Sequence, residues 1–201
     1  MYKRILCTIL GVVLISVCIP NSTLSDASVQ SKGDFLKMSS IDWMYKNMRM
    51  STREKLKKDT AYKRLDVIYT RVMQERFGEV KLSIIRTESA FDNTVVGQMK
   101  ELCMMQINPI WRKELKAQGI IKQWTDLKDA NTCIAAGSFI FDQYYEKYNS
   151  VEKAVVAYNG GGDPEYKKKI LFGLGSLKLA HAEAKYNYNI LNGLKNVDVI
   201  E

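Results

Sequence analysis

Apolar residues recur every three to four positions along the early part of the chain, which is the spacing of amphipathic helices. One such pattern runs over 35–50, and a second runs over 61–77 and ends at Gly78. The segment between them, 51–60, is charged and fits either a connection or the solvated face of a helix. The early part of the chain is therefore predicted to form two helices.

The later part of the chain has the same periodicity. Apolar stripes predict helices over 134–148, 151–158 and 164–184, and the run Asn159-Gly160-Gly161-Gly162 ends the middle one. Only 92–103 lacks a helical period and fits a loop or a small hairpin. The sequence predicts a mainly α, multi-helix globular domain, in which 92–103 is the place for a small β-hairpin.

One carboxylate lies on an apolar helical stripe. Val80, Ile84, Ile85, Glu88 and Phe91 share one face of a predicted helix. Burial raises the pKa of a carboxyl group and keeps it protonated nearer neutral pH, which is the property of a general acid. The sequence therefore makes Glu88 a candidate catalytic acid.

The same position also fits a structural role. Glu88 could cap a neighbouring helix or pair with Arg86 or Arg112. Periodicity alone does not separate these roles from an acid's.

The N-terminus has the pattern of a secretory signal. Lys3 and Arg4 precede an apolar run over 5–19 that Pro20 ends. This run is shorter than the ~20 residues that a membrane-spanning helix needs and fits the apolar region of a signal peptide. We expect a signal peptide over 1–27, an N-terminal helical extension over 28–60 and one domain over 61–195. An uncleaved anchor and a lipoprotein signal at Cys18 are the alternatives.

Composition narrows the function classes. The 26% charged and 46% hydrophobic residues exclude global disorder. The net charge of +8 favours an anionic partner, but no basic stretch has interleaved aromatics, which argues against nucleic acid. A single His, no Cys-x-x-Cys pair and no phosphate-binding glycine loop predict neither a metal nor a cofactor.

Four cysteines divide between the signal segment and the rest of the chain. Removal of 1–27 takes away Cys7 and Cys18 and leaves Cys103 and Cys133. In an oxidising compartment an even pair suggests one disulfide, and two buried free thiols are the alternative.

Three motifs in order carry a family resemblance. They are Glu88-Ser89-Ala90-Phe91, then Met105-Gln106-Ile107-Asn108, then Ala157-Tyr158-Asn159-Gly160-Gly161. Together they resemble the lysozyme-like lytic transglycosylases of the SLT family. The version here, with MQINPIW after Cys103, looks most like the specialised wall-opening members of conjugation, type IV and type III secretion systems. Phage-encoded relatives share the same core.

Two departures from the family pattern involve cysteine. The resemblance puts Gly at Cys103 and Asn at Cys133, so a disulfide between them would clamp the motif loop to the following helix. A loop of this length would contribute about 3–4 kcal/mol in the chain-entropy model.

The resemblance implies a reaction. The substrate would be the β-1,4 bond between N-acetylmuramic acid and N-acetylglucosamine in peptidoglycan, and the product a 1,6-anhydro sugar. Glu88 would be the catalytic residue. The positions that match the family's substrate-binding residues are Ser89, Met105, Gln106, Tyr158 and Asn159. Peptidoglycan strands would be the partner, with components of a secretion or conjugation machine as possible further partners, in the periplasm or at the cell wall.

Two other functions stay open. A hydrolytic muramidase, such as a phage-encoded lysozyme, needs a carboxylate that holds a water, and Glu101 is a better candidate for it than Asp92. A non-catalytic wall-binding module that keeps the fold is the second. His181 and Lys167-Lys168-Lys169 lie outside the motifs and are predicted to be structural and solvated, respectively.

Overall fold

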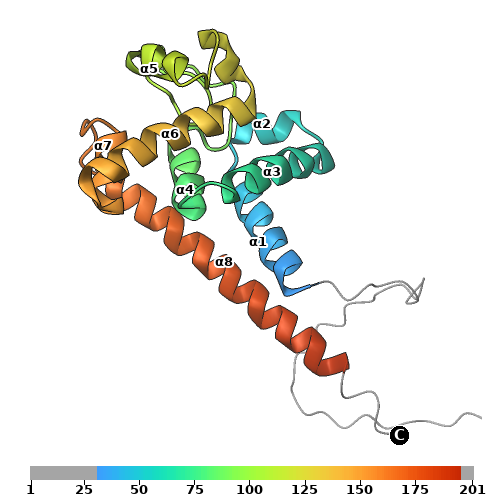
Figure 1. Ribbon diagram of the computed structural model, residues 1–201. Helices are drawn as coiled ribbons and strands as arrows, with labels where there is room; N and C mark the ends of the chain where they lie inside the picture. The colour runs from blue at the N-terminus through green and yellow to red at the C-terminus, as the bar shows by residue number, and fades with distance from the viewer. Residues whose placement is uncertain (1–30, 196–201) are drawn as a thin grey trace, which may run out of the picture. The chain divides into compact units, whose positions relative to one another are not determined.

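The computed structural model describes residues 31–195 (Figure 1). The predicted signal segment 1–27 lies outside these residues. Between Ser31 and Lys195 the chain is helical with connecting loops, which confirms the mainly α prediction. The elements are α1 (Lys32–Asn47), α2 (Met50–Lys55), α3 (Lys58–Met73), α4 (Gly78–Ser89), the 3₁₀ turn η1 (Pro109–Trp111), α5 (Arg112–Ala117), the 3₁₀ turn η2 (Trp124–Lys128), α6 (Ala130–Tyr148), α7 (Val151–Tyr158) and α8 (Tyr166–Lys195). No helix in this part is both long enough and apolar enough to cross a bilayer.

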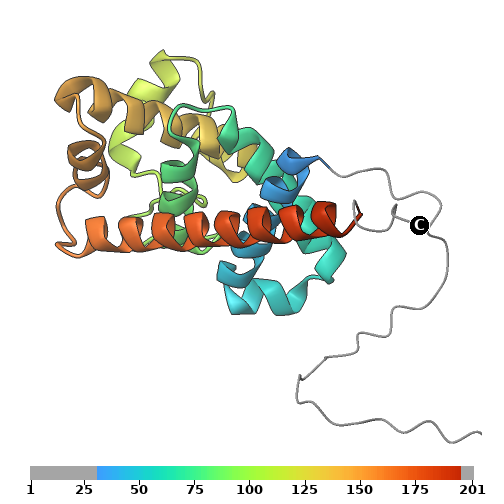
Figure 2. The same cartoon turned by 90° about the horizontal axis from the view of Figure 1, so that it is seen from below.

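Helix α4 is the buried centre of the fold. Leu82, Ile84 and Ile85 are fully buried, and α3 and α8 pack against the helix. The Lys81 side chain is buried too, and its Nζ donates to both carboxylate oxygens of Asp142 on α6 at 3.0 and 3.2 Å. Figure 2 shows α8 lengthwise across the other helices, which lie on both sides of it in this view. This packing holds α4 on several sides, so its C-terminal end is firmly placed.

Helices α1 and α8 also pack on each other, so residues 31–60 of the predicted extension belong to the same folded unit as the rest of the described chain. Trp43 Nε1 donates to Ser176 Oγ at 2.8 Å, and Ser40 Oγ lies 2.7 Å from His181 Nε2. His181 thus has the structural role that the sequence predicts, because burial and these contacts tie α8 to α1.

Several predicted helix ends shift. The segment 51–60 contains α2 and the start of α3, and α3 ends at Met73 instead of Phe77. Gly78 is instead the first residue of α4. A Cβ at this position would lie 2.9 Å from Met73 Sδ and 3.0 Å from the Val72 carbonyl oxygen, so a larger residue does not fit. Glycine is needed here for close approach of two helices, and the sequence pattern misassigned it as a stop.

The last helix is longer than predicted, and the possible hairpin is reduced to bridges. α8 continues to Lys195, beyond the predicted end at 184, because packing on α1 supports its second half. Over 92–107 the described chain has only isolated bridges, from Leu102 to Val96 and to Ile107. Lys100 and Cys103 have positive φ, which interrupts any regular strand.

Cys103 and Cys133 form a disulfide with a Cα–Cα distance of 6.1 Å. It joins the loop after α4 to the first turn of α6. A second contact lies nearby, where Met105 packs so closely on Gly137 that a Cβ there would lie 2.3 Å from Met105 Sδ. The motif loop is therefore attached to α6 by a covalent bond and by a close van der Waals contact.

Candidate active site

Glu88 lies in the last turn of α4 and is half-buried. The chain turns sharply behind it, since Ala90 and Phe91 both have left-handed backbone angles, φ 52° and 62°. Phe91 is thus off the helix, and its buried ring meets Trp43 edge-on at 5.8 Å. This turn ends the helix at the carboxylate and leaves Glu88 facing the loops that follow α4.

The carboxyl group of Glu88 accepts a hydrogen bond from Tyr166 Oη at 2.6 Å. Burial raises the pKa of Glu88 to about 7. The Tyr166 hydrogen bond and the cation of Lys169 act against this rise, while the carboxylates of Glu101 and Asp163 add to it. A carboxyl with this pKa is partly protonated at neutral pH and can donate a proton.

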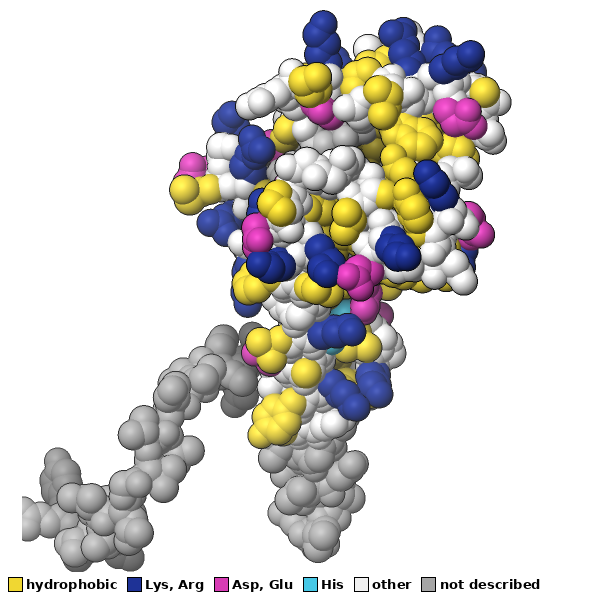
Figure 3. All heavy atoms as spheres, turned by 90° about the vertical axis from the view of Figure 1, so that its left-hand side faces the viewer, with side chains coloured by type: hydrophobic (Ala, Val, Ile, Leu, Met, Phe, Trp, Pro, Cys, Tyr) yellow, Lys and Arg dark blue, Asp and Glu magenta, His cyan; other side chains and the backbone are white. Residues whose placement is uncertain are grey.

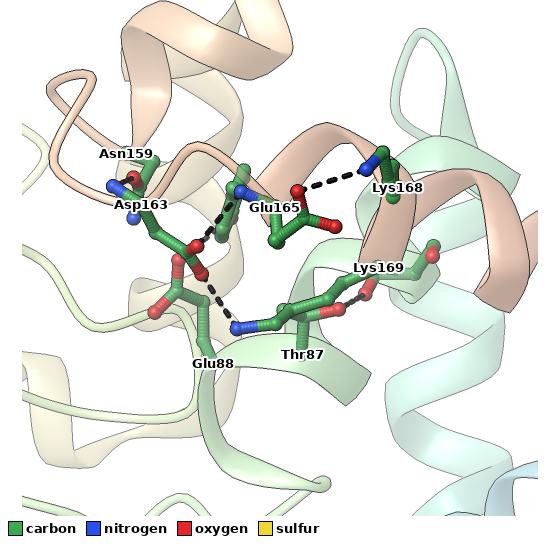
Figure 4. Close-up of polar contacts among 9 residues, drawn as sticks. Thr87, Glu88, Asn159, Asp163, Glu165, Lys168 and Lys169 are labelled. Atoms are coloured by element: carbon green, nitrogen blue, oxygen red, sulfur yellow. Dashed lines mark hydrogen bonds and ion pairs between the residues drawn. The ribbon is translucent and has the colours of Figure 1, made fainter.

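The turn before α8 and the first residues of α8 lie beside this carboxyl (Figure 4). The Glu88 side chain points toward Asp163 and Lys169, whose Oδ2 and Nζ atoms are 2.6 Å apart. Asp163 is held in turn by Asn159, whose Oδ1 accepts from the Asp163 N–H at 2.8 Å. The glycine-rich turn after α7 is thereby closed onto the site.

The alternative pairings of Glu88 are not formed. Arg86 Nε donates instead to Asn47 Oδ1 at 2.7 Å, and Arg112 is exposed at the start of α5. The described polar partner of Glu88 is a tyrosine hydroxyl, which leaves its pKa high where an arginine would have lowered it.

Gln106 and Tyr158 brace the motif loop. Gln106 has φ 48°, and its Nε2 donates to the Cys103 carbonyl at 2.8 Å and to the Val95 carbonyl at 3.3 Å. Tyr158 Oη donates to the Met105 carbonyl at 2.9 Å. Both side chains are half-buried and hold the loop from two sides.

Ser89 and Met105 are buried, at 2% and 0% exposure. The Ser89 hydroxyl donates to the Ile85 carbonyl at 3.2 Å, within its own helix. Neither side chain lines a surface in this structure, so both support the site from within. This position differs from the substrate contact that the family resemblance implied for them.

Sequence reasoning missed Tyr166, Asp163 and Lys169. Tyr166 is 3% exposed and donates to Glu88, yet the apolar pattern over 164–184 did not single it out. The sequence feature that could have pointed to Tyr166 is its position after the glycine run and Pro164, in the first turn of the last predicted helix.

The two other candidate carboxylates have different surroundings. Asp92 is buried and accepts from Thr52 and Thr94, with Arg49 3.9 Å away, so its pKa is lowered despite burial. These bonds fix the turn after α4 and give Asp92 a structural role. Glu101 Oε2 accepts from the Met99 N–H at 2.9 Å, and its Oε1 lies 3.4 Å from Asn108 Nδ2.

A hollow of about 450 Å³ lies beside the site and has basic walls. Arg86, Lys168 and Lys169 line it together with Glu165 and Phe172. Lys168 pairs with Glu165, and the third lysine of the run, Lys167, pairs with Glu152. The three lysines are thus surface ion-pair partners, and Lys169 alone reaches toward Glu88. Within the described residues no group of three or more His, Cys, Asp or Glu side chains is placed to hold a metal ion.

Comparison with known proteins adds a family to this geometry. Comparisons with curated proteins and with solved structures gave no match. A family model does match, over residues 75–171, and its description is Transglycosylase SLT domain. The matched segment runs from just after α3 into α8 and so contains Glu88, the motif loop, the disulfide and Tyr166. Residues 75–171 of this chain therefore match the transglycosylase SLT domain, which supports a place for the chain in the lytic transglycosylase family.

Proposed function

We propose that the chain is a peptidoglycan lytic transglycosylase in which Glu88 is the sole essential acid and base. The observation that carries this proposal is the half-buried carboxyl of Glu88, with a pKa of about 7, inside a matched SLT domain. A group that titrates near neutral pH serves well both as donor and as acceptor of a proton.

The reaction follows from this one carboxyl group. Glu88 donates its proton to the bridging oxygen as the C1–O4 bond of the β-1,4 MurNAc-GlcNAc linkage breaks. The substrate's acetamido group supports the positive charge that develops at C1. The Glu88 carboxylate then takes the proton of the C6 hydroxyl as O6 bonds to C1. The product is 1,6-anhydro-MurNAc, Glu88 is protonated again, and no water is consumed.

The surrounding residues act through position. The cleft around Glu88 is shaped by Gln106, Tyr158 and Asn159. Each of these side chains forms a hydrogen bond with a backbone group of the motif loop or of the turn before α8. Such bonds keep the cleft in place without adding charge. Ser89 and Met105 support it from beneath.

The products of digestion test the reaction. We expect purified peptidoglycan to yield anhydro-muropeptides by mass spectrometry, because the C6 hydroxyl is an intramolecular nucleophile favoured by proximity. Glu101→Gln should keep a substantial fraction of activity and the same products. Its matched control is Glu114→Gln, an exposed carboxylate on α5. Products heavier by one water, with a reducible muramic acid end, would show a hydrolase instead.

One observation favours hydrolysis as the second candidate. Glu101 lies near enough to Glu88 to raise the pKa of Glu88, and a second carboxylate can hold the attacking water of a muramidase. The hydrogen bonds from the Met99 N–H and from Asn108 Nδ2 hold the Glu101 carboxylate on its own loop, which weighs against this role. A non-catalytic wall-binding module is disfavoured by the perturbed pKa of Glu88.

The biological setting is a further part of the proposal. The signal-like residues 1–27 and the need to reach peptidoglycan support export to the periplasm or cell wall. The MQINPIW version of the second motif supports local wall opening for a secretion or conjugation machine, with a phage lysis role as the alternative. The positive net charge suits an anionic wall.

The pH dependence of activity should move when Tyr166 is changed. Tyr166 stabilises ionised Glu88, so Tyr166→Phe removes a bond that lowers the pKa and the pKa of Glu88 should rise. Since the reaction begins from protonated Glu88, the alkaline limb of kcat/KM should lie near pH 7 in the wild type and at higher pH in the variant. Rates measured across the pH range check this.

Tyr158→Phe is the matched control for that experiment. Its hydroxyl bonds the Met105 carbonyl, so this variant should lose stability and leave the alkaline limb of the rate profile in place. An unchanged alkaline limb in Tyr166→Phe would contradict the assigned contact.

A further inference from the structure

Helix α8 has two apolar faces, and the described part of the chain covers only one. Ile170 and Leu177 are buried against the other helices, and Ser176 bonds Trp43 on α1. The opposite face is exposed, except that the Arg86 guanidinium lies over the Phe172 ring at its first end, 5.2 Å from the ring centroid. Its residues, called the outer seam below, are Phe172, Gly175, Leu179, Ala182, Tyr186 and Ile190. Figure 3 shows hydrophobic side chains at intervals along the lower part of the described surface, with Lys and Arg beside them.

The outer seam has the spacing of a two-stranded coiled coil. Phe172, Leu179 and Tyr186 are seven residues apart and are 66%, 61% and 66% exposed, so they take the a positions of a heptad. Gly175 and Ala182 fall at the d positions between them. These small residues allow another helix to approach, and a Cβ placed on Gly175 would meet nothing within 4 Å.

The charges beside the seam distinguish a parallel from an antiparallel pair of identical helices. Lys178 and Glu183 are both exposed, at a g and an e position, on opposite sides of the seam. They cannot pair within one helix, because five residues place them far apart around its axis. In a parallel pair of identical helices, g of one copy faces the following e of the other, so Lys178 meets the second copy's Glu183 twice by symmetry.

In the antiparallel arrangement the charges beside the seam repel each other. There g faces g, which brings Lys178 of one copy near Lys185 of the other. The repulsion between these two cations disfavours it.

We propose that two copies of this chain associate through their outer seams as a parallel, two-fold symmetric pair. The contact over 172–190 is about 27 Å long at 1.5 Å per residue. α8 is already held in shape by α1 and α4, so association orders little new chain, and a short seam is sufficient.

The pairing places both sites at one end of the dimer. Tyr166, in the first turn of α8, bonds Glu88, and parallel helices have their first turns side by side. If the proposed function holds, one dimer presents two clefts to the same region of wall, which raises the effective concentration of the second cleft once the first is bound.

Sedimentation equilibrium of the full chain tests the association. We expect the mass to rise with concentration from the monomer value of 23.0 kDa toward twice that value. Leu179→Gln removes the central seam side chain and should weaken association by at least about tenfold, a loss typical of a central interface residue. Val67→Gln is the matched control, because Val67 is 53% exposed on α3, and it should dimerise as the wild type does.

Charge exchange tests the orientation. Lys178→Glu and Glu183→Lys should each dimerise more weakly than the wild type, because each places like charges across the seam. An equimolar mixture of the two variants should regain dimer, and so should the double exchange. Stronger association of Lys178→Glu would overturn the parallel pair, because this variant relieves repulsion only in the antiparallel arrangement.

Three other results would also overturn the proposal. One is equal association of the wild type and Leu179→Gln. Another is a full chain that stays monomeric while the chain without residues 1–30 dimerises, which would assign the seam to that segment. The last is a monomer that binds vesicles of phosphatidylglycerol and phosphatidylethanolamine and loses this binding in Leu179→Gln, which assigns the seam to a membrane surface.

Discussion

Replacing Glu88 by Gln should lower the rate of peptidoglycan cleavage by a factor of about 100 or more, the usual contribution of a general acid. Gln keeps the size of the side chain and can still accept from Tyr166, but it holds no proton that it can give up. Since the proposed reaction uses the same carboxyl for both proton transfers, no other side chain would take over. Release of soluble muropeptides measures the loss.

The fold of this variant should survive, and its stability should depend less on pH. In the wild type the folded pKa of Glu88 is raised above its ordinary 4.5 to about 7, so the folded protein holds this proton more tightly than the unfolded chain. Its contribution to stability is complete below pH 4.5 and is lost as the pH rises through 7. Glu88→Gln removes this loss, so thermal unfolding near pH 8 should be no worse than in the wild type.

Glu54→Gln is the control, because Glu54 is an exposed carboxylate on α2 and its loss should leave activity unchanged. A general acid's loss should leave about a hundredth of the rate or less. A folded Glu88→Gln variant that keeps more than about a tenth of the wild-type rate would therefore refute the role of Glu88.

Removing the disulfide should have the largest effect on stability. Changing Cys103 and Cys133 together to Ser should lower the free energy of unfolding by about 3–4 kcal/mol, because the unfolded chain regains the entropy of a loop of this length. Denaturant unfolding measures the change. Reduction of the wild type should cause a loss of similar size, which serves as the internal control.

Thiol titration decides whether the bond is present. Unreduced, denatured protein from an oxidising compartment should show no reactive thiol at Cys103 or Cys133. Two reactive thiols there would exclude the bond. The double Ser variant should also lose activity before it loses its helices, because the loop it frees carries Gln106.

Much of the fold could be read from periodicity. The stripes over 134–148 and 151–158 became α6 and α7 with little change, because capping residues and burial agree there: Asp129 and Ser150 cap them, and Ala154 and Val155 are buried. The helix that carries Glu88 was also predicted. The pattern failed at Gly78 and Phe91, where long-range packing and a left-handed turn outweigh local periodicity.

The sequence by itself determined the class of fold, the apolar stripe that carries Glu88 and the three motifs that resemble a transglycosylase domain, since these depend on local spacing and residue type. Only the tertiary structure decided what Glu88 meets. Tyr166 lies 78 positions further along the chain, and its hydroxyl reaches the carboxyl because α8 packs across α4. Contact with α6 likewise buries Lys81, which bonds Asp142, and Met105, which packs on Gly137. Burial and long-range contact set the pKa of a carboxyl group, and neither is a property of the residues beside it in the sequence.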